Sequence, residues 1–553
     1  MAKFFTYLYS LARLLLAPLI LLGVSESLRA VGPEALRQLC PAGAAVRTGE
    51  GLVLEGVVVS DWRSENMEFN PNFTAAKLDL HMNRRTAYIQ AEDGSAGVRI
   101  VFTTPSENRL ERWDRVAIDL KGCTLSRTAS PDAVTIEGVR ARAIMSVSHG
   151  TGEGVACKRR SISELKDSDI YTLVTLKDMD VVFKEGSWAN VPEEFTPYCP
   201  AIHSGVDYSP LCRMDGWASL LRDAEGSSIY MDVNLLCPWR RNGKPLPQGM
   251  GDVRGIIVHN DMPRYGGNVG RYSIRPLYEG DIMIPRSGKT PWKTLTGWDK
   301  TEETGARLEF ELLGNVGNLY KEGKTGDRIL SNIGSTTGYF WTDSGSEVRV
   351  FSGLGALDAA GRGFVPYSSI MFIGKSASWY IWESDTEYSD TRAFLFSFST
   401  KKVKNSILQF CFEWSEGTQD GNRCWGFPAH WCVECSVDGK SWELLRESAT
   451  GESSIVLRPI AWRDGKIRGS GHDFIKRPAL DSGIGTQQRL FTLPDYACGQ
   501  KTVYLRLAPA STTMSSVRVS DATPTINGNI TRNDTDRETW IRFESARIDY
   551  RQQ

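Results

Sequence analysis

Residues Arg115–Leu120 read Arg-Val-Ala-Ile-Asp-Leu, an alternation that places Val116, Ile118 and Leu120 on one face of an extended chain. Alternation at period two is typical of a β-strand with one buried face and one exposed face. The same pattern recurs far along the chain, where residues 408–414 alternate large apolar side chains with smaller or polar ones. The sequence therefore predicts an all-β protein.

Similar segments occur twice, in the same order, in the first half of the chain. The acidic turn Glu92–Ser95 precedes the apolar segment Val98–Phe102, and the turn Asp223–Ser227 precedes Ile229–Val233. Two diverged copies of one β unit explain this order, and we place them at residues 33–150 and 158–285. Each copy has about five strands and one short helix, the inventory of a small OB-type barrel.

Three segments of this region resemble a known family: Gly56–Asp61, Gln90–Gly94 and Ser161–Lys166. The last of them has the S-x-x-E spacing of a capping box and predicts a short helix. The segments resemble an uncharacterised tandem OB-like domain that is widespread in exported proteins of the Bacteroidota. The resemblance implies export and a β-barrel repeat, and it carries over no catalytic residue.

The second half of the chain predicts a different β domain. Residues 286–300 include Pro291 and the pair Ser287-Gly288 and are expected to be a linker. Residues 301–553 have the strand lengths and long polar connections of a jelly-roll β-sandwich. The segment Val433–Trp442 is similar to a hairpin of discoidin-like, galactose-binding-like sandwiches, in which a Trp after an Asp-Gly turn covers the sheet edge. The resemblance implies that fold for this domain.

The composition excludes several classes of protein. Lys and Arg number 65 against 66 Asp and Glu, so no overall field attracts nucleic acid or acidic lipid. Hydrophobic residues make up 41% of the chain and charged residues 24%, which is typical of globular proteins rather than disordered ones. Six His leave little material for imidazole chemistry. A fibre, a multi-span membrane protein and a basic coating protein are therefore not expected.

Residues 1–27 have the features of an export signal peptide. Lys3 and Arg13 precede the apolar stretch Leu14–Leu22, and small residues follow it. The stretch is shorter than the ~20 residues of a spanning helix, so we expect a mature chain without a membrane span, in the periplasm, at the outer surface or outside the cell. An uncleaved anchor is the alternative. Cys40 follows Leu39 rather than a small residue, so a lipid anchor is not expected.

The eleven cysteines fit an oxidising compartment. Cys199 and Cys212 bracket a loop and are the candidate disulfide. Cys432 and Cys435 form a C-x-x-C, but residues three apart on a strand point to opposite faces, so a shared metal ion is not expected. We predict no cofactor and no catalytic residue. A structural calcium ion, which galactose-binding-like sandwiches often hold, is the alternative.

The distribution of Trp gives a candidate binding site. Eleven of the sixteen Trp lie after residue 290, and two of them fall in loop-like segments. Sugar rings present apolar C–H faces that stack on aromatic rings, while charged and polar neighbours bind the hydroxyls. The alternative is that these rings cover the ends of the sandwich. The candidate carbohydrate-binding residues are Trp425, His430, Trp462, Arg463 and Asp464.

We therefore expect an exported, non-catalytic recognition protein of the cell surface whose partner is a glycan or a surface protein, with carbohydrate as the leading ligand. A secreted hydrolase acting on glycans or phosphodiesters is one alternative, because 66 acidic residues leave room for a carboxylate pair. A structural or assembly module is another.

Single-stranded nucleic acid is a further alternative ligand, which the balanced charge does not favour as a partner. OB-type barrels bind such strands by stacking bases on aromatic rings beside a basic groove. The residues that could serve are the cluster Lys158-Arg159-Arg160, the tyrosines Tyr88, Tyr230 and Tyr272, and the arginines Arg240, Arg241, Arg271 and Arg275.

Overall fold

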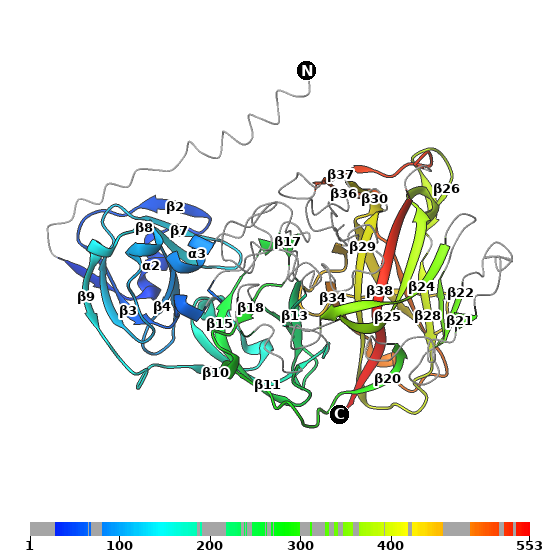
Figure 1. Ribbon diagram of the computed structural model, residues 1–553, viewed down its shortest axis with the longest axis horizontal. Helices are drawn as coiled ribbons and strands as arrows, with labels where there is room; N and C mark the ends of the chain where they lie inside the picture. Colours follow the sequence, from blue (N-terminus) through cyan, green and yellow to red (C-terminus); the bar gives the residue numbers. More distant parts are fainter. Residues whose placement is uncertain are drawn as a thin grey trace, which may run out of the picture.

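The protein is represented by a computed structural model (Figure 1), which describes residues 28–64, 66–67, 80–184, 188–190, 217–233, 237, 239, 246–259, 261–262, 267–268, 270–298, 310–311, 327–330, 337–340, 347–357, 364–391, 393–418, 423–456, 487–518, 525–534 and 538–553. Strands dominate these residues, and the helices among them are α2 (Pro33–Leu39), α3 (Leu80–Arg85) and short 3₁₀ turns. The predicted all-β class is confirmed at this level. Neither α2 nor α3 has the length and hydrophobicity that crossing a bilayer requires.

The described parts lie in a row in chain order, from the blue strands at one end to the yellow and red strands at the other (Figure 1). The first part is a nine-stranded sheet, which we call the first sheet, with the order β2-β7-β8-β5-β4-β3-β6-β9 and β1 paired with β3. Its strands are β1 (Arg29–Val31), β2 (Ala44–Arg47), β3 (Leu52–Val58), β4 (Thr86–Gln90), β5 (Gly97–Phe102), β6 (Arg115–Asp119), β7 (Thr124–Arg127), β8 (Val134–Val139) and β9 (Ile144–Ser148).

The alternation in β6 produces the predicted pattern of buried and exposed side chains. Val116 and Ile118 are buried and their neighbours in the strand are partly exposed, because one face of β6 packs on the core. The acidic turn between β4 and β5 also folds as expected for a hairpin. Asp93 Oδ1 accepts a hydrogen bond from the backbone N–H of Ser95 at 2.8 Å, and Gly94 takes the left-handed conformation (φ +65°) that a tight turn requires.

The second part contains a closed five-stranded barrel, which we call the barrel. Strand β11 pairs with both β13 and β15, so β11, β13, β14, β18 and β15 form a ring. Strands β14 and β18 are parallel, as are β5 and β8 of the first sheet. The strands here are β10 (Lys158–Arg160), β11 (Leu173–Val181), β12 (Ala189–Asn190), β13 (Trp217–Arg222), β14 (Ser228–Met231), β15 (Met250–Val258), β18 (Ser273–Arg275) and β19 (Ile282–Met283), with β16 (Asp261–Met262) and β17 (Gly267–Asn268) as a separate pair.

The capping box predicted at Ser161 is present. The Ser161 N–H donates to Glu164 Oε2 at 2.7 Å, and the Ser161 hydroxyl donates to the same oxygen at 2.9 Å. The helix that it starts is a single 3₁₀ turn, Ile162–Glu164, because the chain resumes an extended conformation at Leu165.

The third part consists of two large sheets, which we call the sandwich. One has the order β24-β25-β38-β29-β34, with β20 paired with β38, and the other has the order β21-β22-β23-β28-β35-β31-β32, with β33 paired with β31. The first contains β20 (Lys293–Trp298), β24 (Glu347–Leu357), β25 (Phe364–Lys375), β29 (Ser406–Thr418), β34 (Gln487–Thr492) and β38 (Glu538–Gln552). The second contains β21 (Phe310–Glu311), β22 (Asp327–Leu330), β23 (Thr337–Phe340), β28 (Phe394–Phe398), β31 (His430–Ser436), β32 (Glu443–Leu444), β33 (Ile455–Val456) and β35 (Val503–Pro509).

Aromatic side chains fill the space between these two sheets. The ring centroid of Phe394, on β28, lies 4.9 Å from that of Phe543 on β38. Trp414 on β29 lies 5.6 Å from Trp431 on β31. Each pair joins one sheet to the other, so the alternating aromatic residues of the sequence form one core. Smaller pairings join β26 (Tyr380–Trp382) to β27 (Tyr388–Thr391), and join β36 (Thr513–Arg518) to both β30 (Arg423–Pro428) and β37 (Thr525–Asn529).

Two further sequence expectations can be compared with the strands. The hairpin of Val433–Trp442 is present as β31 and β32, with Gly439 at φ +70° in its turn and the ring of Trp442 under the guanidinium of Arg506, 4.7 Å from the ring centroid. Strand β20 begins within the stretch expected to be a linker and pairs with β38. The backbone that follows the barrel therefore adds a strand to one sheet of the sandwich.

Each of the three parts is in contact with the next. Tyr88 of the first sheet and Val59, directly after β3, share an apolar cluster with Leu173, Ile256 and Val258 of the barrel. Across the other boundary, residues of the barrel region pack on two residues of the sandwich, and the cluster is Val182, Phe183, Ala218, Leu220, Tyr230, Cys411 and Leu490. The second boundary holds the pocket described below.

Candidate functional site

Most of the residues predicted as a carbohydrate site lie outside the described residues. This applies to Trp462, Arg463 and Asp464, and to the side chain of Trp425, whose backbone belongs to β30. His430 begins β31 and is partly buried, with its Nδ1 3.4 Å from the hydroxyl of Ser454. The candidate disulfide, Cys199 with Cys212, also lies outside the described residues. These expectations stay predictions.

The C-x-x-C pair behaves as the strand geometry predicts. Cys435 is buried with Trp431 and Val433, whereas Cys432 is partly exposed on the other face with Glu434. Burial is the main cause that raises the pKa of each thiol to about 11, so both are protonated at neutral pH. In the part of the chain that the structure describes, no group of three His, Cys, Asp or Glu side chains is arranged to hold a metal ion.

Two of the three predicted stacking tyrosines, Tyr88 and Tyr230, are not available for bases. Tyr88 and Tyr230 are 1% and 0% exposed, because both rings fill boundaries between parts of the molecule. The Tyr272 hydroxyl donates to Asp167 Oδ1 at 2.6 Å, and Arg271 pairs with the same carboxylate. Arg275 is buried, while Arg240 and Arg241 lie outside the described residues. The suggestion that these tyrosines bind nucleic acid is therefore wrong for Tyr88 and Tyr230.

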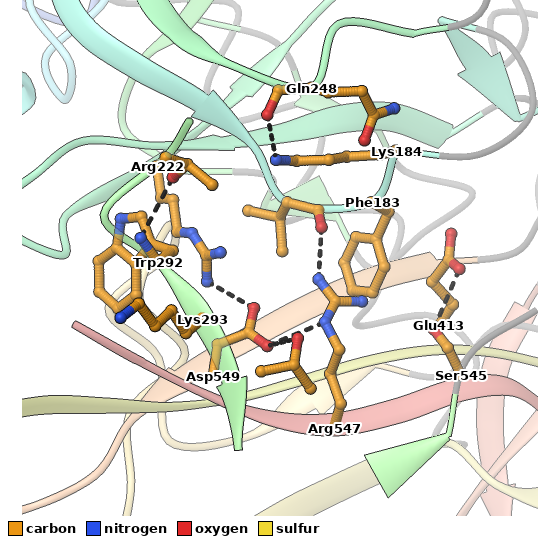
Figure 2. Close-up of a pocket in the computed structure, with 13 residues that line it drawn as sticks. Phe183, Lys184, Arg222, Gln248, Trp292, Lys293, Glu413, Ser545, Arg547 and Asp549 are labelled. Atoms are coloured by element: carbon orange, nitrogen blue, oxygen red, sulfur yellow. Dashed lines mark hydrogen bonds and ion pairs between the residues drawn. The ribbon is translucent and has the colours of Figure 1, made fainter. Parts of the chain in front are cut away.

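A pocket of about 210 Å³ lies between the barrel and the sandwich, and we call it the junction pocket (Figure 2). Six segments of the chain line it. The described lining residues are Val182, Phe183, Lys184, Arg222, Gln248, Thr290, Trp292, Lys293, Thr294, Glu413, Ser545, Arg547 and Asp549.

Arg222, the last residue of β13, forms one wall of the pocket. Its Nε donates to Asp180 Oδ2 of β11 at 3.0 Å, and its Nη1 donates to Asp549 Oδ2 of β38 at 2.8 Å. Its guanidinium lies over the ring of Trp292, 4.2 Å from the centroid. Arg222 and both carboxylates are almost fully buried. This side chain therefore joins the barrel to the sandwich by ion pairs shielded from water.

Arg547 forms the facing wall. It lies two residues before Asp549 on β38 and thus on the same face of the strand. Its Nε donates to Asp549 Oδ1 at 3.0 Å, and its Nη2 donates to the carbonyl of Val182. The guanidinium also lies over the ring of Phe183, 4.8 Å from the centroid. Figure 2 shows Asp549 between the two arginines.

Lys184 lies on the opposite side of the pocket from Asp549 (Figure 2). Its Nζ is 2.9 Å from Asp180 Oδ1 and donates to the carbonyl of Gln248 at 2.9 Å. Arg222 uses the other oxygen of Asp180, so one carboxylate holds both cations beside each other. A second acid, Glu413, accepts hydrogen bonds from Gln488 Nε2 at 3.0 Å and from the Ser545 hydroxyl at 3.1 Å.

Asp549 and Arg222 are both charged at neutral pH. Burial opposes ionisation of Asp549, but Arg547 and Arg222 outweigh it and lower the pKa of this carboxyl to about 2. Burial likewise opposes the charge of Arg222, yet Asp549 and Asp180 raise its pKa. Cys411 lies behind the cluster, where burial and then Asp549 raise its pKa to about 12, so it remains a thiol. The ion pair of Arg222 with Asp549 is therefore a fixed pair of charges in the pocket wall, which suits binding a polar molecule.

Sequence reasoning did not find the junction pocket. Its charged residues are isolated in the sequence, and Arg547 and Asp549 lie in the last strand of the chain. The usable signal was the alternation itself, because it puts two opposite charges on the same face of the closing strand. Which partners face them depends on how the barrel docks.

No protein-family model matches this chain, and no curated protein matches it. Among solved structures, the K2 cleaved adhesin domain of Lys-gingipain is 12% identical, with 39% of this chain and 88% of that chain covered and a TM-score of 0.18. The K1 cleaved adhesin domain of Lys-gingipain from Porphyromonas gingivalis W83 is 10% identical, with 39% and 98% covered and a TM-score of 0.15. Similarity of this size does not establish a shared fold.

Proposed function

We propose that this chain is an exported, non-catalytic recognition protein of the cell surface that binds carbohydrate, and that the junction pocket is its main binding site. The observation that carries the proposal is the combination of groups in the pocket wall. Guanidinium, carboxylate, amide and hydroxyl groups surround about 210 Å³ beside the rings of Trp292 and Phe183. Such groups exchange hydrogen bonds with the hydroxyls of a sugar.

The wall is organised before a ligand arrives. Asp549 holds Arg222 and Arg547, and Asp180 holds Lys184, so these long side chains lose little conformational freedom on binding. The volume is below the ~300–1,000 Å³ of pockets for drug-sized ligands. One monosaccharide, free or at the end of a glycan, is therefore the size of ligand that this pocket suits.

The architecture that we propose has two OB-like units at residues 33–150 and 158–285, and a jelly-roll, galactose-binding-like sandwich at residues 301–553. The closed barrel and the shared parallel pairs, β5 with β8 and β14 with β18, support the repeat. We retain Trp425, His430, Trp462, Arg463 and Asp464 as a second carbohydrate contact in the sandwich.

A glycan array probed with the full chain tests the function, with calorimetry on the glycans that bind. We expect binding without turnover, weakened about tenfold by Lys184→Gln, because a charge-assisted hydrogen bond is worth about 1.5 kcal/mol. Lys289→Gln, an exposed lysine outside the pocket lining, is the matched control and should bind like the wild type. Loss with Trp425→Ala or Trp462→Ala alone would move the site to the sandwich. Depletion of a glycan by the purified chain would indicate a hydrolase instead.

A further inference from the structure

The described lining of the junction pocket carries an excess of positive charge. Four lining residues are cationic, namely Lys184, Arg222, Lys293 and Arg547, whereas Glu413 and Asp549 are the anionic ones. Asp180 lies behind the wall and contributes one more negative charge through its pairs with Arg222 and Lys184. Four cations against these three carboxylates leave the cluster one positive charge in excess.

Both lining carboxylates are already occupied. Asp549 accepts hydrogen bonds from Arg222, from Arg547 and, at 2.9 Å, from the hydroxyl of Thr294. Glu413 accepts from Gln488 and Ser545. The carboxylate oxygens of the wall thus already accept hydrogen bonds from the protein itself. The groups left to bind a ligand are mainly hydrogen-bond donors.

Two donors remain beside each other. Arg222 uses Nε and Nη1, and its Nη2 has no hydrogen-bond partner among the described residues. Lys184 Nζ has three protons and contacts Asp180 and the Gln248 carbonyl in the described structure. Because Arg222 Nε and Lys184 Nζ bind the two oxygens of one carboxylate, the two cationic groups are neighbours. A guanidinium nitrogen beside an ammonium group is suited to bind a carboxylate.

We propose that the junction pocket selects an acidic monosaccharide, a uronate whose carboxylate lies on Arg222 Nη2 and Lys184 Nζ. This inference rests on the proposed function, since it names the class of sugar that the same pocket takes. Lys293, exposed at the rim, adds positive charge that attracts the ligand. A free uronate and a uronate at the end of a glycan share this chemistry.

Calorimetry on the full chain tests the inference with four probes: D-glucuronate, a disaccharide with the same uronate at its non-reducing end, D-glucose, and glutarate, which has carboxylates but no sugar ring. We expect both uronates to bind at least tenfold more tightly than D-glucose. Lys184→Gln should weaken uronate binding about tenfold and D-glucose binding less than twofold. Lys293→Gln should weaken uronate binding by a smaller factor that vanishes at high salt, and Lys289→Gln is the matched control.

The outcomes separate the two claims. Equal affinity for D-glucuronate and D-glucose would overturn the uronate inference and leave carbohydrate binding intact. Glutarate binding as tightly as D-glucuronate, with no binding of D-glucose, would overturn the sugar claim and leave a carboxylate site. Binding of the disaccharide alone would assign the pocket to glycan ends, and binding of the free uronate alone would assign it to the monosaccharide. If none of the probes binds, both claims fail.

Discussion

Asp549 is a buried carboxylate at the boundary between barrel and sandwich that binds groups from both. It is 2% exposed, and its two oxygens bind two arginines and a threonine from three different strands. A buried carboxylate is tolerated only when such partners replace the water that it loses. Arg222 and Arg547 depend on Asp549 in turn, because both guanidinium groups are buried beside it.

Replacing this carboxylate tests that dependence. Asp549→Asn removes the negative charge between Arg222 and Arg547, and we expect the free energy of unfolding to fall by about 3 kcal/mol. Chemical denaturation followed by Trp fluorescence measures the loss. Asp385→Asn, at an exposed position, should change stability by less than ~0.5 kcal/mol. An equal effect of the two substitutions would show that the buried pairs contribute nothing.

The pH dependence of stability follows from the same residue. The pKa of Asp549 is lowered from 3.8 to about 2 in the folded chain, so its contribution is complete above pH 3.8 and is lost as the pH falls towards about 2. Thermal unfolding recorded between pH 5 and pH 2 should show a steeper fall for the wild type than for Asp549→Asn. Parallel acid limbs for the two proteins would contradict this assignment.

At the scale of elements, the sandwich is organised by β38. This strand pairs with β25, β29 and β20, and its inward side chains reach the facing sheet. Phe543 contacts Phe394 of that sheet and Trp414 of its own sheet, with ring centroids 4.9 and 5.9 Å away. The same strand carries the arginine and the aspartate of the junction pocket, so its packing positions the site.

Truncating that core ring measures the contribution of β38 to stability. Phe543→Ala should lower the free energy of unfolding by about 3–5 kcal/mol, because the aromatic core cannot close over the cavity. Urea denaturation monitors the change. Val437→Ala, on an exposed apolar residue of the same domain, should cost less than ~0.5 kcal/mol. A small effect of Phe543→Ala would place the core elsewhere.

At the scale of the whole molecule, close backbone contact fixes how the first sheet meets the barrel. Gly97 of β5 lies so near residue 171 that a Cβ added there would be 2.4 Å from the carbonyl carbon and oxygen of Tyr171. Hydrogen bonds cross the same boundary, among them one from the Leu173 N–H to Gln90 Oε1 and one from the Asp132 N–H to Asp167 Oδ2, both at 2.8 Å. A side chain at position 97 would have to separate these parts.

Gly97→Ala should therefore lower stability by about 2 kcal/mol and increase the maximum dimension of the chain. Small-angle X-ray scattering measures the dimension and thermal unfolding measures the stability. Gly49→Ala is the matched control, because a Cβ there meets no atom within 4 Å. If the two variants scatter and melt alike, the contact at Gly97 does not hold the boundary together.

The sequence by itself determined the β class, the inward face of β6, the acidic hairpin turn and the capping box at Ser161, because each depends on neighbours within a few residues. Only the tertiary structure decided that Tyr88 and Tyr230 are buried at boundaries and that Asp180, Arg222 and Asp549 meet in one ion-pair cluster at the junction pocket. Alternation predicts which face of a strand a side chain occupies. It does not predict what packs against that face, because that depends on contacts between residues hundreds of positions apart.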